Sequence, residues 1–280
     1  MALRVYGDPS LRQSTDLDLF VKRADVSHAH DVLRELGYDG IIPDALSRRT
    51  AFIESSYVLA FRSPDALRVE LHWNIVLRRF AIEIDFDDIW RRSERMTFAG
   101  RQISCCAPED LLLLLCVHGA RHQWRRIEWI CDVAELIRSS PAIAWNEIRL
   151  RAHDSSVERI VRLGLFLARR LLGAVTPPDV DAWILEDPRV AALAAQIRDS
   201  FDTKAIDEPG VFSAARFDVA VRQRKRDKLR YLWRAAFTPT ECDWTLVSLP
   251  ESLEFGYWVL HPTRLAMKYA AHGLRLRRSS

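Results

Sequence analysis

The chain has 280 residues, which suffices for one large domain or two of ordinary size. Its formal net charge of +3 is too small to indicate a nucleic-acid partner, while 49% hydrophobic and 28% charged residues can fill packed cores. The longest apolar run, at residues 111–117, is far shorter than the ~20 residues of a membrane helix. These features exclude a membrane-spanning helix and give no support to a DNA- or RNA-binding protein.

The cysteines indicate the compartment. Their number is odd, and they lack the C-x-x-C spacing of a zinc site, so we expect buried free thiols in a reducing environment and no disulfide-linked partner. The N-terminus has no apolar segment typical of a signal peptide. We therefore expect a cytoplasmic protein with no membrane partner. The five cysteines are Cys105, Cys106, Cys116, Cys131 and Cys242.

The first clear pattern in the chain is the stretch 14–21, where acidic and apolar residues alternate before the run becomes apolar. This pattern predicts a β-strand, because successive side chains of a strand point to opposite faces. Asp16 and Asp18 then share one face, and Leu17 and Leu19 share the other. We expect the leucines to pack on helices. The two carboxylates can reach a single hard cation such as Mg²⁺, which prefers oxygen ligands.

A second strand of the same kind is predicted at Arg68–Asn74. Val69, Leu71 and Trp73 alternate with polar residues, so the apolar side chains lie on one face. The other face carries Glu70, followed two residues later by His72. If this strand neighbours the first one, Glu70 joins Asp16 and Asp18.

The remaining elements are predicted from periodicity, caps and turns. Residues 1–13 are too few for a full leading element, and Ala99-Gly100 predicts a hairpin turn. Pro108 suits a first helical turn, and the chain is helical from there on. Before Pro108 we expect a helix at Val26–Leu36 and strands at Thr50–Ser55, Tyr57–Arg62, Met96–Phe98 and Arg101–Cys105. After it we expect helices near 109–122, 126–138, 145–153, 157–172, 179–185, 189–201, 214–237 and 251–271.

This order of elements predicts an α+β fold, with a mixed-sheet head followed by an all-helical body. We place the α/β head at residues 1–106 and the helical domain at residues 107–280.

The three acidic residues carry the strongest chemical signal. Carboxylates that share one sheet face repel one another unless a cation holds them, and two-metal phosphoryl chemistry uses such a set. His118 and His122 share a helix face. Gly119 stands where the H-E-x-x-H zinc motif needs a glutamate, so we expect the two histidines to face a substrate or to serve the structure. Asp132 either makes a salt bridge at an interface or faces the active cleft.

Several of these segments, taken in order, resemble a bacterial family labelled uncharacterised nucleotidyltransferase, which belongs to the DNA polymerase β superfamily. The resemblance covers roughly residues 6–138 and, more loosely, 230–270. It is carried by Tyr6-Gly7-Asp8-Pro9-Ser10-Leu11-Arg12, by Asp16-Leu17-Asp18-Leu19, by Val69-Glu70-Leu71-His72-Trp73, by Pro108-Glu109-Asp110-Leu111-Leu112, by His118-Gly119-Ala120-Arg121-His122 with Trp124, and by Trp129-Ile130-Cys131-Asp132.

The resemblance implies a metal-dependent transfer of a nucleoside monophosphate from an NTP to an acceptor of unknown identity, which could be a small molecule, a protein or an RNA. Asp16, Asp18 and Glu70 would be the catalytic residues and would hold Mg²⁺ or Mn²⁺. The nucleotide phosphates would lie beside Arg12 and Ser14. The candidates to line the substrate pocket are His72, His118, His122, Trp124 and Asp132.

The chain departs from the superfamily in one respect. Members usually carry a Gly-Ser or Lys-Gly element upstream of the acidic strand, whose backbone N–H groups bind the phosphates at a helix N-terminus. Only Gly7-Asp8 stands there, so we expect that either the start codon is assigned too late or the phosphate-binding element is lost.

Two alternatives remain open beside the transferase. The first is a catalytically inactive binding or regulatory module with a nucleotidyltransferase fold. The second is a glycosyltransferase that uses D-x-D to hold a nucleotide sugar, for which Asp16 lies early in the chain.

Overall fold

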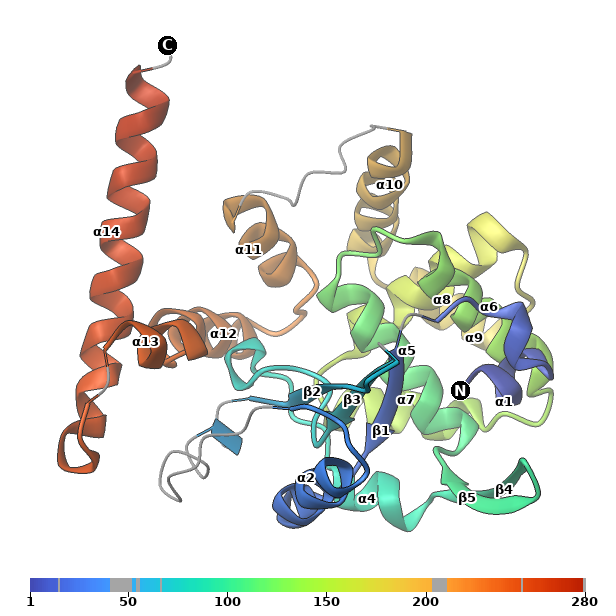
Figure 1. Cartoon of the computed structure of the whole chain (residues 1–280). Coiled ribbons are helices and arrows are strands. Elements are labelled where there is room, and N and C mark those ends of the chain that lie inside the picture. Colours follow the sequence, from blue (N-terminus) through green and yellow to red (C-terminus); the bar gives the residue numbers. More distant parts are fainter. Residues whose placement is uncertain are drawn as a thin grey trace. The chain divides into compact units, whose positions relative to one another are not determined.

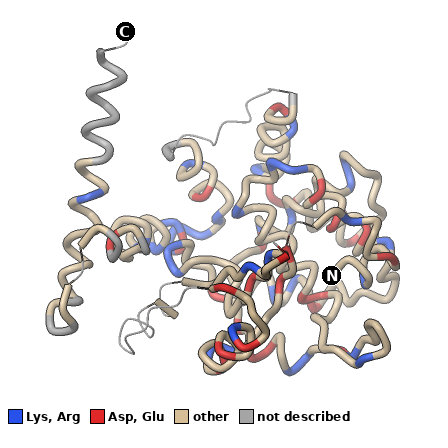
Figure 2. Tube along the Cα trace, in the orientation of Figure 1, with Lys and Arg blue, Asp and Glu red and all other residues tan. Residues whose placement is uncertain are grey.

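The computed structural model describes residues 1–14, 16–40, 52–53, 56–65, 67–202, 211–247 and 249–278. Contacts divide the chain into two compact units. We call them the helical unit (Met1–Ser14 and Ile82–Lys228) and the sheet unit (Thr15–Ala81 and Leu229–Ser280). Each unit consists of two segments, and the segments of the two units alternate along the chain. The predicted domain boundary after residue 106 divides the chain differently and stays a prediction. Charges of both signs are interspersed along the chain (Figure 2), consistent with the small net charge.

A small mixed sheet near the N-terminus followed by many helices confirms the α+β fold class (Figure 1). The sheet has the strand order β1-β3-β2, with β1 (Asp16–Phe20) parallel to β3 (Arg68–His72) and β2 (Val58–Arg62) antiparallel to it. The predicted strand at Thr50–Ser55 lies mostly outside the described residues, and the two that are described, 52–53, are helical. In this strand order β3 is the central strand and pairs with β1 on one side and β2 on the other.

One face of this sheet forms the core of the sheet unit. Leu59 and Phe61 of β2 pack with Val69 and Leu71 of β3, and α2 (Val26–Glu35) covers them through Val26. All five side chains are almost completely buried, as expected for alternate positions of strands with one face inward. The apolar face predicted for the strand at Arg68–Asn74 is thus the face of β3 that lies in the core.

The leucines of β1 differ from expectation. Leu17 and Leu19 are 50% and 37% exposed, although register places them beside the buried Val69 and Leu71. The reason is that β1 is an edge strand and the core cluster covers β2 and β3.

The helical unit begins with α1 (Ala2–Tyr6), an element that the sequence did not predict. It ends at Gly7, whose φ of 74° is in the left-handed region that glycine tolerates. Val5 is buried, and α1 packs against α6. The other elements of this unit are α4 (Phe86–Arg91), β4 (Glu94–Phe98), β5 (Arg101–Cys105), α5 (Pro108–Arg121), α6 (Ile127–Ser139), α7 (Trp145–Asp154), α8 (Glu158–Leu172), α9 (Pro178–Leu185), α10 (Pro188–Asp202) and α11 (Val211–Ala220).

Trp124 anchors the core of the helical unit. Its side chain is fully buried, and Gln123 and Trp124 both take positive φ angles, which turn the chain back over α5. A Cβ at Gly119 would lie 2.5 Å from the Trp124 ring, and one at Gly164 of α8 would lie 3.1 Å from it. Two glycines therefore create the space that the indole ring fills between α5 and α8.

The C-terminal part of the chain contains α12 (Lys225–Phe237), α13 (Glu241–Leu246) and α14 (Tyr257–Arg278). In the sheet unit, Asp243 accepts hydrogen bonds from the Thr240 backbone (2.7 Å) and pairs with His261 (2.7 Å) and Arg264. Burial would raise the pKa of Asp243, but these hydrogen bonds lower it to about 2. The carboxylate thus ties α13 to α14. Among the described helices, none combines the length and apolar character needed to cross a membrane.

The packing of Trp124 predicts the effect of Gly119→Ala. Alanine gains ~1 kcal/mol over glycine in a helix, but overpacking against the ring costs ~1–3 kcal/mol. We expect a net loss of up to ~2 kcal/mol in the free energy of unfolding, measured by urea denaturation. In a Trp124→Leu background, which frees the space, the same change should be neutral or stabilising. An equal loss in both backgrounds would contradict this account.

Candidate metal centre

The pairing of β1 with β3 determines which side chains meet. In the parallel register, Asp18 lies opposite Glu70, and Phe20 lies opposite His72. Asp18 and Glu70 share one face of the sheet, and His72, two residues after Glu70, points to the same side. Two short strands therefore bring two carboxylates and an imidazole together without any contribution from a loop.

The donor atoms of Asp18, Glu70 and His72 all lie within 4.8 Å of one another. His72 Nε2 is 3.0 Å from Asp18 Oδ1 and 3.3 Å from Glu70 Oε2. The side chains of Glu70 and His72 are 16% and 11% exposed, whereas that of Asp18 is 57% exposed. The cluster is therefore buried on the β3 side and open to solvent on the β1 side.

Two positively charged side chains, those of Arg68 and His72, balance the charge of the carboxylates. Arg68 forms an ion pair with Glu70, and hydrogen bonding from His72, partly opposed by burial, lowers the pKa of Glu70. Burial alone would lower the pKa of His72, but its hydrogen bonds with Asp18 and Glu70 outweigh it and raise the pKa to about 9. Glu70 is thus ionised near neutral pH, and an imidazolium at position 72 takes the place between the carboxylates that a cation would occupy.

The donor set fits a divalent cation. Ligand atoms that neighbour one another around an ion with bonds of ~2.1 Å lie roughly 3 Å apart, and the two separations from His72 Nε2 are 3.0 and 3.3 Å. Ionised carboxylates are the ligands that hard divalent ions prefer. The two carboxylates can therefore hold one ion, and His72 can join them when the ion displaces the proton on Nε2.

The cluster differs from the predicted ligand set in one member. Asp16 pairs in register with Arg68, and the clustered donor atoms come from Asp18, Glu70 and His72. The role of Asp16 as a ligand stays a prediction. Sequence reasoning assigned His72 to a substrate pocket and missed it as a donor. The signal was present, because Glu70 and His72 are two residues apart on one strand.

Arg12 and Asp132, both predicted site residues, bind each other within the helical unit. Arg12 Nε donates to Asp132 Oδ1 and its terminal nitrogen to Oδ2, both at 2.9 Å, and the Tyr6 hydroxyl donates to Oδ1 at 2.8 Å. The Asp132 side chain is 1% exposed. Burial and the adjacent Asp132 raise the pKa of Tyr6. We call this set the N-terminal latch (Tyr6, Arg12 and Asp132), since it holds the segment before β1 on α6. Ser14 ends this segment.

His118 of α5 and His122, the C-cap residue of that helix, lie side by side, as their spacing predicts. Their ring centroids are 4.7 Å apart, and Trp129 of α6 lies 4.9 Å from His122. Burial, followed by the charges of His118 and nearby arginines, lowers the pKa of His122 to about 3. His122 is therefore neutral near pH 7. Trp124, the third pocket candidate, lies in the core, so the structure assigns it a packing role while its place in a pocket stays a prediction.

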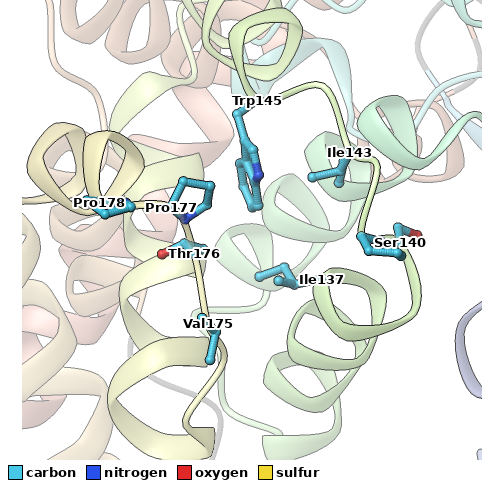
Figure 3. A pocket seen from close by; sticks show the side chains of 9 residues that line it. Ile137, Ser140, Ile143, Trp145, Val175, Thr176, Pro177 and Pro178 are labelled. Atoms are coloured by element: carbon cyan, nitrogen blue, oxygen red, sulfur yellow. The ribbon is translucent and has the colours of Figure 1, made fainter.

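A cavity of about 390 Å³ lies in the helical unit (Figure 3). Apolar side chains form most of its wall, among them Ile137, Trp145, Val175 and Pro177. None of the predicted site residues lines it.

The cysteines are all free thiols; Cys116 is buried, and Cys242 is exposed, unlike the buried thiols expected from the sequence.

The geometry can be compared with known proteins. The profile of a protein family described as uncharacterised nucleotidyltransferase matches residues 1–173, which include both strands of the carboxylate cluster and the N-terminal latch. The chain belongs to this family. Searches of curated proteins and of solved structures find no match. Membership supports nucleotidyl transfer as the general activity of the chain and confirms the resemblance seen in the sequence.

The latch predicts the effect of removing the Asp132 charge. Asp132→Asn leaves Arg12 without its counter-ion, and breaking a buried pair costs ~3–5 kcal/mol. Because Arg12 is 23% exposed, we expect a smaller loss of about 2–3 kcal/mol in the free energy of unfolding. Tyr6→Phe, which removes one hydrogen bond, should cost about 1 kcal/mol. Glu128→Gln, at an exposed pair of the same helix, should cost little. Equal effects of Asp132→Asn and Glu128→Gln would contradict the latch.

The lowered pKa of His122 predicts its titration. Its ring should stay neutral from pH 7 down to about pH 4, because the folded pKa is about 3 against 6.5 for a free histidine. Protonation of His122 therefore favours the unfolded chain. The contribution of the neutral ring to the free energy of unfolding is complete above about pH 6.5 and is lost as the pH falls toward 3. Nitrogen chemical shifts of the ring, assigned with His122→Gln, measure the titration. A midpoint between pH 6 and 7 would disprove the assignment.

Proposed function

We propose that this protein transfers a nucleoside monophosphate from an NTP to an acceptor, with a divalent cation held by Asp18 and Glu70. The observation that carries the proposal is the β1–β3 register, which sets these two carboxylates opposite each other beside His72. Family membership supports the same reaction class. Asp16, on the same strand, is proposed as a further carboxylate of the site.

The reaction joins an acceptor oxygen to the α-phosphorus of the NTP. The bond between the α- and β-phosphates breaks, pyrophosphate leaves, and the acceptor proton passes to a base. When bound, the cation would neutralise phosphate charge and polarise the reacting oxygens. We propose Mg²⁺, or Mn²⁺ in its place.

The residues of the chain divide these tasks according to their charge. Glu70 is ionised and has a lowered pKa, so it is a better ligand and charge partner than a general base, which works best with a pKa near the working pH. The Asp18 carboxylate is exposed, so a nucleotide can reach the site from the β1 side. Arg68 holds Glu70 in place through its ion pair.

The predicted phosphate and pocket residues have roles of their own in this proposal. Arg12 positions the segment that leads into β1 through the latch, and Ser14 lies beside the nucleotide phosphates. His118 and His122 stay the proposed acceptor-contacting residues, and with Trp129 they form an aromatic cluster of the helical unit. Neutral His122 would act there as a hydrogen-bond partner, without a charge.

The experiment follows label from NTPs that are labelled at the α-phosphate, with Mg²⁺ or Mn²⁺, into metabolite, protein and RNA acceptor pools, together with pyrophosphate release. Loss of a metal ligand removes several kcal/mol of transition-state stabilisation, so Asp18→Asn and Glu70→Gln should lower the rate at least ~100-fold. Asp65→Asn, at an exposed turn of the sheet unit, is the matched control and should keep full activity.

Equilibrium binding of the same NTPs separates the transferase from the catalytically inactive binding module. Binding of NTP with a divalent ion, without transfer to any pool, would favour the inactive binding module. Transfer that survives in both Asp18→Asn and Glu70→Gln would disprove the proposed site.

A further inference from the structure

We propose that His72 is a direct ligand of the cation through Nε2, and that the Asp18–Glu70–His72 set therefore binds Mn²⁺ in preference to Mg²⁺. This inference rests on the proposed function, because it concerns the ion of the same site. It adds a nitrogen ligand to a site in which sequence reasoning placed carboxylates alone.

The position of His72 supports a direct bond. Nε2 lies 3.0 Å from an oxygen of Asp18 and 3.3 Å from an oxygen of Glu70, so the three atoms surround a common point. Nδ1 is buried and has no hydrogen-bond partner among the described residues. Nε2 is thus the nitrogen through which this imidazole meets polar groups, and it is directed at the two carboxylates. The cation would displace the Nε2 proton to solvent, and the bound imidazole would then be neutral, with its remaining proton on Nδ1.

Packing holds the imidazole ring in this orientation. His72 is 9% exposed, and the ring lies between Phe20, at 5.4 Å between centroids, and Tyr57, at 5.9 Å. Its backbone belongs to the central strand, paired with Phe20 of β1 and Val58 of β2. A donor that is fixed before the ion arrives loses little conformational freedom when the ion binds.

The chemistry of the donor atoms determines which divalent ion the site prefers. Mg²⁺ takes oxygen ligands in a near-ideal octahedron and keeps several waters. Imidazole nitrogen suits transition-metal ions, whereas carboxylates suit Mg²⁺, Ca²⁺ and Mn²⁺. Mn²⁺ accepts carboxylate oxygens as Mg²⁺ does, and as a transition-metal ion it also binds imidazole nitrogen. One nitrogen beside two carboxylate oxygens therefore favours Mn²⁺.

The test measures metal binding by the full chain without nucleotide, so it is independent of transfer activity. With Mn²⁺ bound, pulsed electron paramagnetic resonance should detect nitrogen coupling that changes when histidine is labelled with ¹⁵N. The coupling should vanish in His72→Gln and persist in His30→Gln, which alters a buried histidine of α2. If His72→Gln fails to fold, a wild-type spectrum without histidine nitrogen coupling would still overturn the inference.

Affinities give a second readout. By calorimetry, the wild type should bind Mn²⁺ at least ~10-fold more tightly than Mg²⁺. His72→Gln should lose ~10–100-fold in Mn²⁺ affinity, as loss of metal-site groups commonly does, and less than about 3-fold in Mg²⁺ affinity. Circular dichroism confirms that the variant is folded.

Two outcomes would overturn the inference, and a third would overturn only the proposed function. Mn²⁺ binding without histidine nitrogen coupling, with His72→Gln unchanged in affinity, would make His72 a positioning residue that holds Asp18 by a hydrogen bond. Absence of Mn²⁺ binding would exclude the site for this ion. If Mn²⁺ binds through His72 but no nucleotide is transferred, the inference stands and the proposed function fails.

Discussion

The parallel pairing of β1 with β3 is the constraint on which the candidate centre depends. It places Asp18 beside Glu70, and the alternation along β3 adds His72 to the same face. Because side chains of a strand alternate with a period of two, a slip of one residue would turn these donors toward the apolar face. The buried side chains Val69 and Leu71 resist such a slip, since they would become exposed. The hydrophobic core of the sheet unit thus determines which side chains form the candidate metal centre.

Charge balance explains why these carboxylates can sit together. Two carboxylates on one face repel each other, and in this protein Arg68 and His72 offset them. A divalent ion would take over this role with more charge at the same point. The latch serves the adjoining segment: Asp132 holds Tyr6 and Arg12 on the helical unit, and the chain passes into the sheet unit just before β1 begins.

Much of this site follows from local sequence patterns, and part of it does not. Alternation identified β1 and β3, because the two-residue period of a strand is visible in four or five residues. Spacing on a helix placed His118 next to His122. The partner of Arg12 could not be predicted, since Asp132 is 120 residues away and no local pattern links them. The burial of Trp124 was equally hidden, as it depends on Gly164 of another helix. Exposure of Leu17 and Leu19 depends on strand order, which the sequence leaves open.

The most direct test of the central claim is the position of the ion itself. Crystals grown with Mn²⁺ and a non-hydrolysable NTP analogue would show the ion as a peak in an anomalous difference map. The account predicts one peak bonded to oxygens of both Asp18 and Glu70, at ~2.1–2.3 Å, with the α-phosphate beside it. A peak elsewhere in the protein, or a bound nucleotide distant from β1 and β3, would contradict it.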